Sequence, residues 1–178
     1  MKPLLALFAL APLVACTAEA PPQVDDQAVL YLGIRNAVLV EPGVVSTGQP
    51  TEEQLAALPA LGYRTVIQLR PADEEGTGWE EAQAAELGLT FLRLPVSGIE
   101  GVTEENARAL DAALADVGRS GVVVACASGN RVGGLFALRA HYCEGAAPEE
   151  ALELGKQAGM TRAEPAVREI LGLPDDEE

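Results

Sequence analysis

The stretch VVVACASGNR, residues 122–131, decides the fold. Residues 121–125 (GVVVA) form an unbroken apolar run, which is typical of a central strand that is buried on both faces of a sheet. A short loop with a glycine follows, and a helix is expected from Arg131 to Cys143. The strand therefore delivers Cys126 to the carboxyl edge of the sheet, where open α/β sheets bind their ligands.

The loop after the strand has the composition of an anion site. Its backbone amides and the N-terminus of the following helix can point at one spot above Cys126, with the positive end of the helix dipole behind them. The same field stabilises a thiolate, and Arg131 can donate two hydrogen bonds to one oxyanion. The loop residues are Ala127, Ser128, Gly129 and Asn130. The pattern predicts a thiolate nucleophile in an oxyanion cradle, although a purely structural cysteine beside a surface arginine fits the spacing too.

Short apolar runs alternate with helical stretches on both sides of this loop. Strands are expected at 37–47 (a strand or a hairpin, broken by Pro42 and Gly43), 65–69 and 90–94. Helices are expected from the capping box at Thr51 to near Gly62, and then at 79–87, 103–117, 148–158 and 165–171. This order predicts an α/β three-layer sandwich, with a mostly parallel central sheet flanked by helices, over residues 28–172. Residues 173–178 form an acidic tail.

The N-terminus reads MKPLLALFALAPLVAC. Its apolar run is shorter than the roughly 20 residues that a membrane-spanning helix needs, which favours a signal peptide. The ending LVAC resembles the lipobox of bacterial lipoproteins. The resemblance implies a signal peptide at 1–15, a lipidated Cys16, a flexible tether at 16–27 and a cell-envelope lipoprotein on the periplasmic face of the outer or inner membrane. A plain secretory signal with a chance cysteine is the alternative.

Charge and composition exclude several classes of function. The chain has 178 residues, 12 Lys and Arg against 27 Asp and Glu, and a net charge of −15, which argues against nucleic-acid binding. One His and three Cys without a C-x-x-C pair argue against a structural zinc site. No phosphate-binding or dinucleotide-binding glycine pattern occurs, so no metal and no cofactor is expected.

Three further segments match the loop to a known family: STGQPT at 46–51, GYRTVIQLR at 62–70 and LPV at 94–96. From Ser46 to about Arg168 the chain resembles bacterial phosphatases of the dual-specificity and tyrosine-phosphatase-like type, most closely the group called beta-lactamase hydrolase-like protein phosphatases. The resemblance implies a cysteine-phosphatase-like fold with Cys126 as nucleophile. It also implies that the amides of 127–130, together with Arg131, hold the phosphate.

The chain departs from the usual phosphatase pattern in four ways. Four residues instead of five separate Cys126 from the arginine, Ala125 stands where a His is usual, and Val132 stands where a Ser or Thr is usual. The Asp that normally follows the LPV segment as general acid is absent, which leaves Glu100 and Asp73 as candidates. General acid catalysis contributes roughly a hundredfold to ten-thousandfold, so its loss would restrict turnover to good leaving groups.

Three functions therefore stay open. The first is a lipid-tethered phosphatase that hydrolyses phosphomonoesters through Cys126. The second is a rhodanese-like sulfurtransferase or persulfide carrier, because rhodaneses use a similar short loop that ends in Arg. The third is a catalytically impaired, phosphate-binding pseudophosphatase. The expected partner is a phosphorylated substrate, with no nucleic acid and with membrane contact through the lipid anchor only.

Three other residues have simpler interpretations. His141 lies about 15 Å along the helix from Arg131, too far to act as a base for Cys126. Cys143 lies about 18 Å away by the same rise, so no disulfide between Cys126 and Cys143 is expected. Arg70 follows the strand at 65–69, and either lines the pocket or forms a surface salt bridge.

Overall fold

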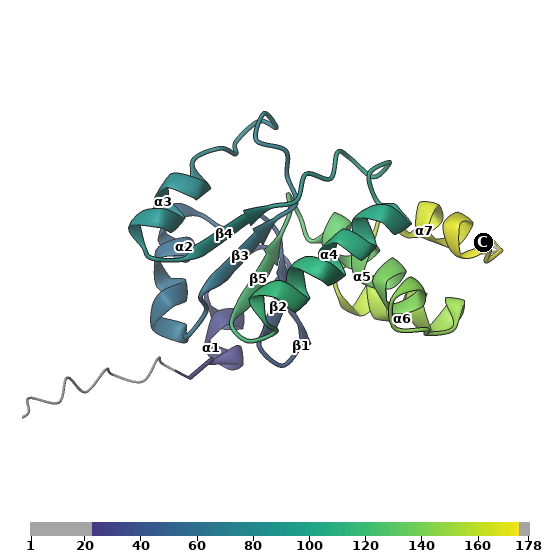
Figure 1. Ribbon diagram of the computed structural model, residues 1–178, viewed down its shortest axis with the longest axis horizontal. Coiled ribbons are helices and arrows are strands. Elements are labelled where there is room, and N and C mark those ends of the chain that lie inside the picture. The colour runs from purple at the N-terminus through teal and green to yellow at the C-terminus, as the bar shows by residue number, and fades with distance from the viewer. Residues whose placement is uncertain (1–22, 175–178) are drawn as a thin grey trace, which may run out of the picture.

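The computed structural model describes residues 23–174, which form a five-stranded sheet with helices on both faces (Figure 1). The strands are β1 (Val38–Glu41), β2 (Val44–Thr47), β3 (Thr65–Gln68), β4 (Thr90–Arg93) and β5 (Val122–Ala125), in the order β1-β2-β5-β3-β4. Strand β1 is antiparallel to β2, and all other neighbours are parallel. The expected α/β class with a mostly parallel sheet is confirmed.

Strand β5 lies in the middle of the sheet, as its apolar run predicts. All four of its residues are buried, and Ala125 pairs with both Thr47 of β2 and Gln68 of β3. The three strands therefore end in register at one edge. The loops that follow β2, β3 and β5 therefore lie close together at that edge.

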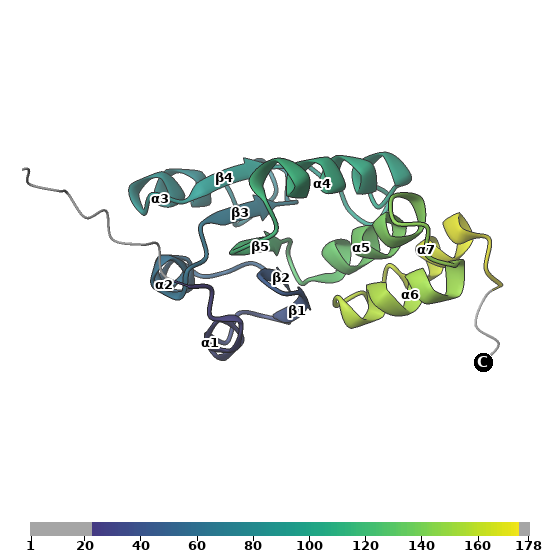
Figure 2. The same cartoon turned by 60° about the horizontal axis from the view of Figure 1, so that its bottom comes forward.

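Alternate side chains of β5 enter two separate apolar cores. Val122 and Val124 face one core, and Val123 and Ala125 face the other. The first core lies under α4 (Glu104–Val117), α5 (Asn130–Tyr142), α6 (Pro148–Gln157) and α7 (Glu164–Leu171). The second lies under α1 (Asp26–Tyr31), α2 (Glu52–Ala57) and α3 (Glu80–Glu86). Figure 2 shows the sheet between the two groups of helices.

Local sequence signals set the helix boundaries. Thr51 and Gln54 form the expected capping box at the start of α2, and Thr103 caps α4. Pro59 ends the regular helix early, because proline has no backbone N–H to donate within a helix. The chain continues as a 3₁₀ turn, η1 (Leu58–Leu61). Gly62 then terminates it with a left-handed backbone, φ 81°.

The folded part begins before the expected boundary at residue 28. Asp25 caps α1, and the Tyr63 hydroxyl donates to Asp26 Oδ1 over 2.7 Å. Asp25 and Asp26 thus belong to the domain rather than to the tether, because their carboxylates accept hydrogen bonds from groups of the fold. The signal peptide, the lipidated Cys16 and most of the tether lie outside the described residues. Within 23–174 no helix is long and apolar enough to cross a membrane.

Candidate active site

Loops that follow β3, β4 and β5 meet at the carboxyl edge of the sheet and enclose a pocket of about 330 Å³. Its lining residues are Glu74, Gly98, Ile99, Ala127, Ser128, Asn130, Arg131 and Arg162. Cys126 itself is only 1% exposed and lies directly before the lining residues Ala127 and Ser128. The pocket therefore opens onto the loop that the sequence singled out.

Neighbouring segments hold the loop by its carbonyl groups. The Gln49 amide donates to Ala127 O over 3.5 Å, and the Asn36 side chain donates to Ser128 O over 2.9 Å. In a trans peptide the N–H points opposite to the C=O, so these bonds turn the next amides toward the other side. Gly129, at φ 81°, makes the sharp turn into α5.

The first turn of α5 offers three more amides. The first intrahelical bond of α5 runs from the Gly133 amide to Gly129 O over 2.8 Å. The amides of Asn130, Arg131 and Val132 therefore have no acceptor within the helix. The first turn contains no acidic residue, so no side chain of the helix itself opposes the positive end of its dipole.

Arg131 is paired with a residue that the sequence did not suggest. Its Nη1 donates to Glu74 Oε2 (2.8 Å) and to Val96 O (2.7 Å), and its Nη2 donates to Glu74 Oε1 (2.8 Å). A guanidinium has five N–H groups in one plane. These bonds use three of them and leave Nε–H and one Nη2–H, which share the remaining edge. That edge is a two-pronged donor suited to two oxygens of one anion.

Electrostatics fix the charge state of this pair. The hydrogen bond from Arg131, with a further one from Arg70, lowers the pKa of Glu74 from 4.5 to about 2 against the opposing effect of burial. The bond with Glu74 raises the pKa of Arg131, and the nearby Cys126 contributes in the same direction. Glu74 is therefore a carboxylate at neutral pH and has no proton to give as a general acid.

A buried polar network holds Glu74 from behind. Arg70 donates to Glu74 Oε1 (2.7 Å) and to Gln49 Oε1 (3.1 Å), and it also donates to the carbonyl of Glu75. Gln49 in turn donates to the buried Glu80 over 2.9 Å. Arg70 does not line the pocket; it forms the expected salt bridge, with Glu74, but it is only 8% exposed, so the bridge is buried rather than at the surface. Arg70 thereby positions Glu74.

The two candidate general acids lie in different places. Glu100 is exposed, and its carboxylate lies against Gly98, which lines the pocket. Asp73 is exposed and does not line the pocket. The next residue, Glu74, lines it instead. Of the two, the structure brings Glu100 next to the pocket.

Asn130 brings a residue into the site that sequence reasoning missed. Its Oδ1 accepts hydrogen bonds from the amides of Thr161 (2.8 Å) and Ala163 (3.1 Å) and from the Thr161 hydroxyl (3.2 Å). Arg162, between them, thereby lines the same pocket as Arg131. No local pattern around residue 162 signals this, because the contact depends on how α6 packs against α5.

The remaining titratable residues stand apart from the loop. His141 shares a 2.8 Å hydrogen bond with Ala146 O near the C-terminal end of α5. Cys126 and Cys143 are both free thiols, which confirms that no disulfide joins them. Among residues 23–174, no group of three or more His, Cys, Asp or Glu side chains is arranged to hold a metal ion.

Comparison with known proteins places this site in a family. Residues 38–168 match the family model described as "DSP-PTPase phosphatase fused to NAD+ Kinase". Beta-lactamase hydrolase-like proteins from two strains of Xylella fastidiosa, Temecula1 and 9a5c, are each 38% identical to this chain over 96 residues, or 52% of it. The match spans only 22% of the length of these relatives.

Solved structures share the fold at low sequence identity. A DUF442 protein from Shewanella putrefaciens CN-32 aligns with a TM-score of 0.62 at 20% identity, covering 82% of this chain and 96% of that one. A Cys-to-Ser variant of TpbA from P. aeruginosa, in complex with phosphotyrosine, aligns with a TM-score of 0.51 at 20% identity, covering 74% and 85%. Since the family model spans residues 38–168, the chain belongs to the DSP-PTPase phosphatase family.

Proposed function

We propose that this protein hydrolyses phosphomonoesters through a phosphocysteine intermediate on Cys126. One observation carries the proposal: the free edge of the Arg131 guanidinium and the unbonded first-turn amides of α5 adjoin the same cysteine. These donors suit a phosphoryl group whose charge grows on its equatorial oxygens in the transition state.

The reaction has two displacements. The Cys126 thiolate attacks phosphorus, the P–O bond to the alcohol breaks, and the alcohol oxygen leaves with the bonding pair and takes up a proton. Water then attacks the phosphocysteine, its P–S bond breaks, and inorganic phosphate and the thiolate are released. Arg131 and the loop amides hold the phosphoryl oxygens in both steps.

Among the described residues, the site has no clear general acid to protonate the leaving group. Glu74 is ionised, and of the two candidate acids only Glu100 has its carboxyl group against a lining residue, Gly98. Substrates whose leaving alcohol needs no protonation, such as aryl phosphates, should therefore react best. The phosphotyrosine in complex with the TpbA variant is an aryl phosphate.

The test is turnover of 4-nitrophenyl phosphate by the reduced full chain, beside Cys126→Ser and Cys143→Ser. Cys126→Ser should lower kcat by at least about a thousandfold, because the remaining hydroxyl is not activated. Cys143→Ser removes the other described free thiol and should leave kcat unchanged. Equal turnover by the wild type and Cys126→Ser would overturn the phosphocysteine mechanism.

An inactive wild type would contradict the hydrolase proposal altogether. Transfer of sulfur from a persulfide on Cys126 to cyanide would then support the sulfurtransferase alternative. Phosphate binding without either activity would identify a pseudophosphatase.

We also propose that the protein acts outside the cytoplasm, on a lipid anchor at Cys16. The LVAC sequence before the tether supports this proposal. Mass spectrometry of the mature N-terminus should find a diacylglyceryl cysteine, and Cys16→Ala should abolish it. A mature chain that begins elsewhere would contradict the anchor.

A further inference from the structure

The pocket above the cysteine loop adjoins a second hollow, and Arg162 lines both. The second hollow has a volume of about 920 Å³, and Lys156, Glu164 and Arg168 also line it. Together the two linings contain four cationic and two carboxylate side chains. Glu153 on Lys156 and Glu100 beside Gly98 add two carboxylates, so the region is charge-balanced within a chain of net charge −15, and what distinguishes it is a cation without a partner in the described part of the chain.

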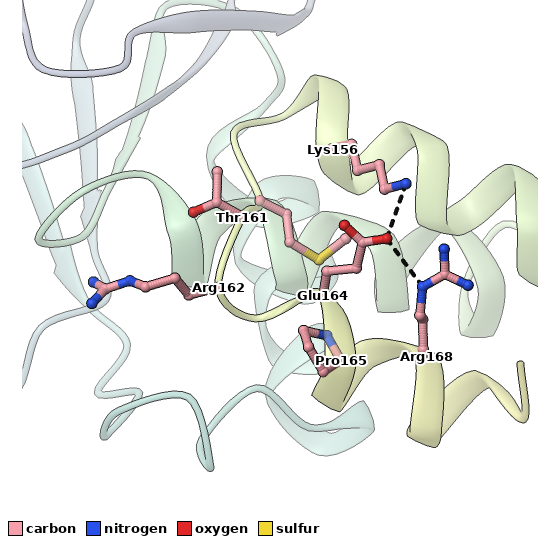
Figure 3. Close-up of a pocket in the computed structure, with 7 residues that line it drawn as sticks. Lys156, Thr161, Arg162, Glu164, Pro165 and Arg168 are labelled. Carbon is pink, nitrogen blue, oxygen red and sulfur yellow. Dashed lines mark hydrogen bonds and ion pairs between the residues drawn. The ribbon is translucent and has the colours of Figure 1, made fainter. Parts of the chain in front are cut away.

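Within this region Arg162 differs from the other cations. Glu164 pairs with Lys156 over 2.9 Å and with Arg168 over 3.0 Å (Figure 3). Figure 3 shows the Arg162 side chain extending away from that cluster. Arg162 is exposed and makes no hydrogen bond or ion pair with any residue in 23–174. Its five donors are therefore available to a ligand.

The backbone of Arg162 is nevertheless fixed relative to the loop. The three hydrogen bonds to Asn130 Oδ1 bind the residues on either side of it to the residue before Arg131. Next to this contact, Gly133 lets α5 pack closely against the C-terminal part of α6, since a Cβ atom at Gly133 would lie only 2.7 Å from Gly155 O. An arginine with free donors is thus held at the 330 Å³ pocket by the pocket's own loop.

We propose that Arg162 binds a second anionic group of the substrate, so that the preferred substrates are phosphomonoesters that carry a carboxylate or another phosphate beyond the ester oxygen. This inference rests on the proposed phosphatase function. Arg131 and the loop amides take the reacting phosphoryl group, and Arg162 takes the second anion at the rim. The Arg162 guanidinium, unpaired within residues 23–174, gives this strongly acidic protein a local donor for such a substrate.

The experiment compares three probes: 4-carboxyphenyl phosphate, the matching carboxamide, and 1,4-phenylene bisphosphate. Each is assayed with the wild type, with Arg162→Gln and with Arg64→Gln. Arg64 precedes β3 at the opposite edge of the sheet, so its substitution removes the same charge away from the site. For each enzyme, kcat/KM of an anionic probe is divided by kcat/KM of the carboxamide. The ratio corrects for any general change in activity that a substitution causes.

Arg162→Gln should lower kcat/KM about tenfold for a probe with a second anion, as expected for loss of one partly exposed charged hydrogen bond. The carboxamide rate should change less than about twofold, and Arg64→Gln should change neither ratio. The carboxylate and bisphosphate arms show which second anion is bound. Equal losses on all three probes, or no loss on either anionic probe, would overturn the inference while leaving the phosphatase function intact.

If the wild type turns over none of the probes, the proposed function is wrong, and the role of Arg162 is tested by ligand binding instead. Calorimetry with Cys126→Ser should then show tighter binding of the carboxylate than of the carboxamide, and Arg162→Gln should abolish the difference. Equal binding of the two compounds to Cys126→Ser would overturn the inference.

Discussion

Arg131 and Glu74 show how a buried cation can be kept ready for an anion that is not yet bound. Arg131 is 7% exposed, and a guanidinium left unpaired at that depth would be strongly destabilising. Glu74 satisfies one edge of the guanidinium and leaves the other edge free. In the proposed mechanism, the pair fixes the orientation of the donors before a phosphate binds, which is the preorganisation that electrostatic catalysis requires.

The Glu74 pairing predicts a specific dependence of stability on pH. The pKa of this carboxyl is about 2 in the folded protein against 4.5 without its partners, so the unfolded chain binds the proton more readily. The stabilisation is present above about pH 4.5 and is lost progressively as pH falls toward 2. Urea unfolding between pH 6 and pH 3 should show a steeper loss for the wild type than for Glu74→Gln.

Glu81→Gln is the matched control, because Glu81 lies exposed on α3. It should keep the wild-type slope of unfolding free energy against pH. If Glu74→Gln also kept that slope, the Glu74–Arg131 pair would not be the source of the acid sensitivity.

At the scale of elements, α5 connects the reactive loop to the helices behind it. Its first turn supplies amides to the pocket, and its small residues let α6 come close. A Cβ at Gly133 would overlap the backbone nitrogen of Met160 and approach Gly155 O to 2.7 Å. Since these are backbone atoms, no side-chain rotation can relieve the overlap.

Gly133→Ala should therefore destabilise the protein by about 1–2 kcal/mol, because overpacking outweighs the gain in helix propensity of about 1 kcal/mol. Gly134→Ala is the comparison, since the nearest atom there is a Val102 methyl at 2.8 Å, which has more freedom to move. It should destabilise less. Denaturant midpoints measure both, and an unchanged or raised midpoint for Gly133→Ala would contradict the close α5–α6 contact.

The elements with strong local signals were predictable. The apolar run 121–125 predicts β5, and the caps at Thr51 and Thr103 predict the starts of α2 and α4. Helix α1 is not among the predicted helices, and the predicted tether includes its first two residues. At the site, the loop and its arginine follow from sequence, but Glu74 and Arg162 do not. Their places depend on which way one loop side chain turns and on packing between helices distant in sequence.

At the scale of the molecule, one strand serves both cores. Val123 and Val124 are neighbours in the chain but are buried in opposite cores. If β5 separates from one core, the side chains that it buries in the other core become exposed as well. The two layers of helices should therefore unfold together.

Two probes can test this coupling. Trp79, the only tryptophan, packs against the core under α1–α3, whereas far-UV circular dichroism is dominated by the longer helices α4–α7. Tryptophan fluorescence and dichroism should give one coincident thermal transition. Val123→Ala should lower the midpoint of both signals equally. A separate, earlier fluorescence transition would show that the two cores unfold independently.

The Asn130 contact has a consequence for how proteins with this fold can diverge. Asn130 accepts from the backbone amides of residues 161 and 163 and never from the side chain of residue 162. Any amino acid can therefore stand at 162 while the reactive loop keeps its shape. If Arg162 binds the second anion as proposed, a single codon change at 162 can alter substrate preference and leave the chemistry of the loop unchanged.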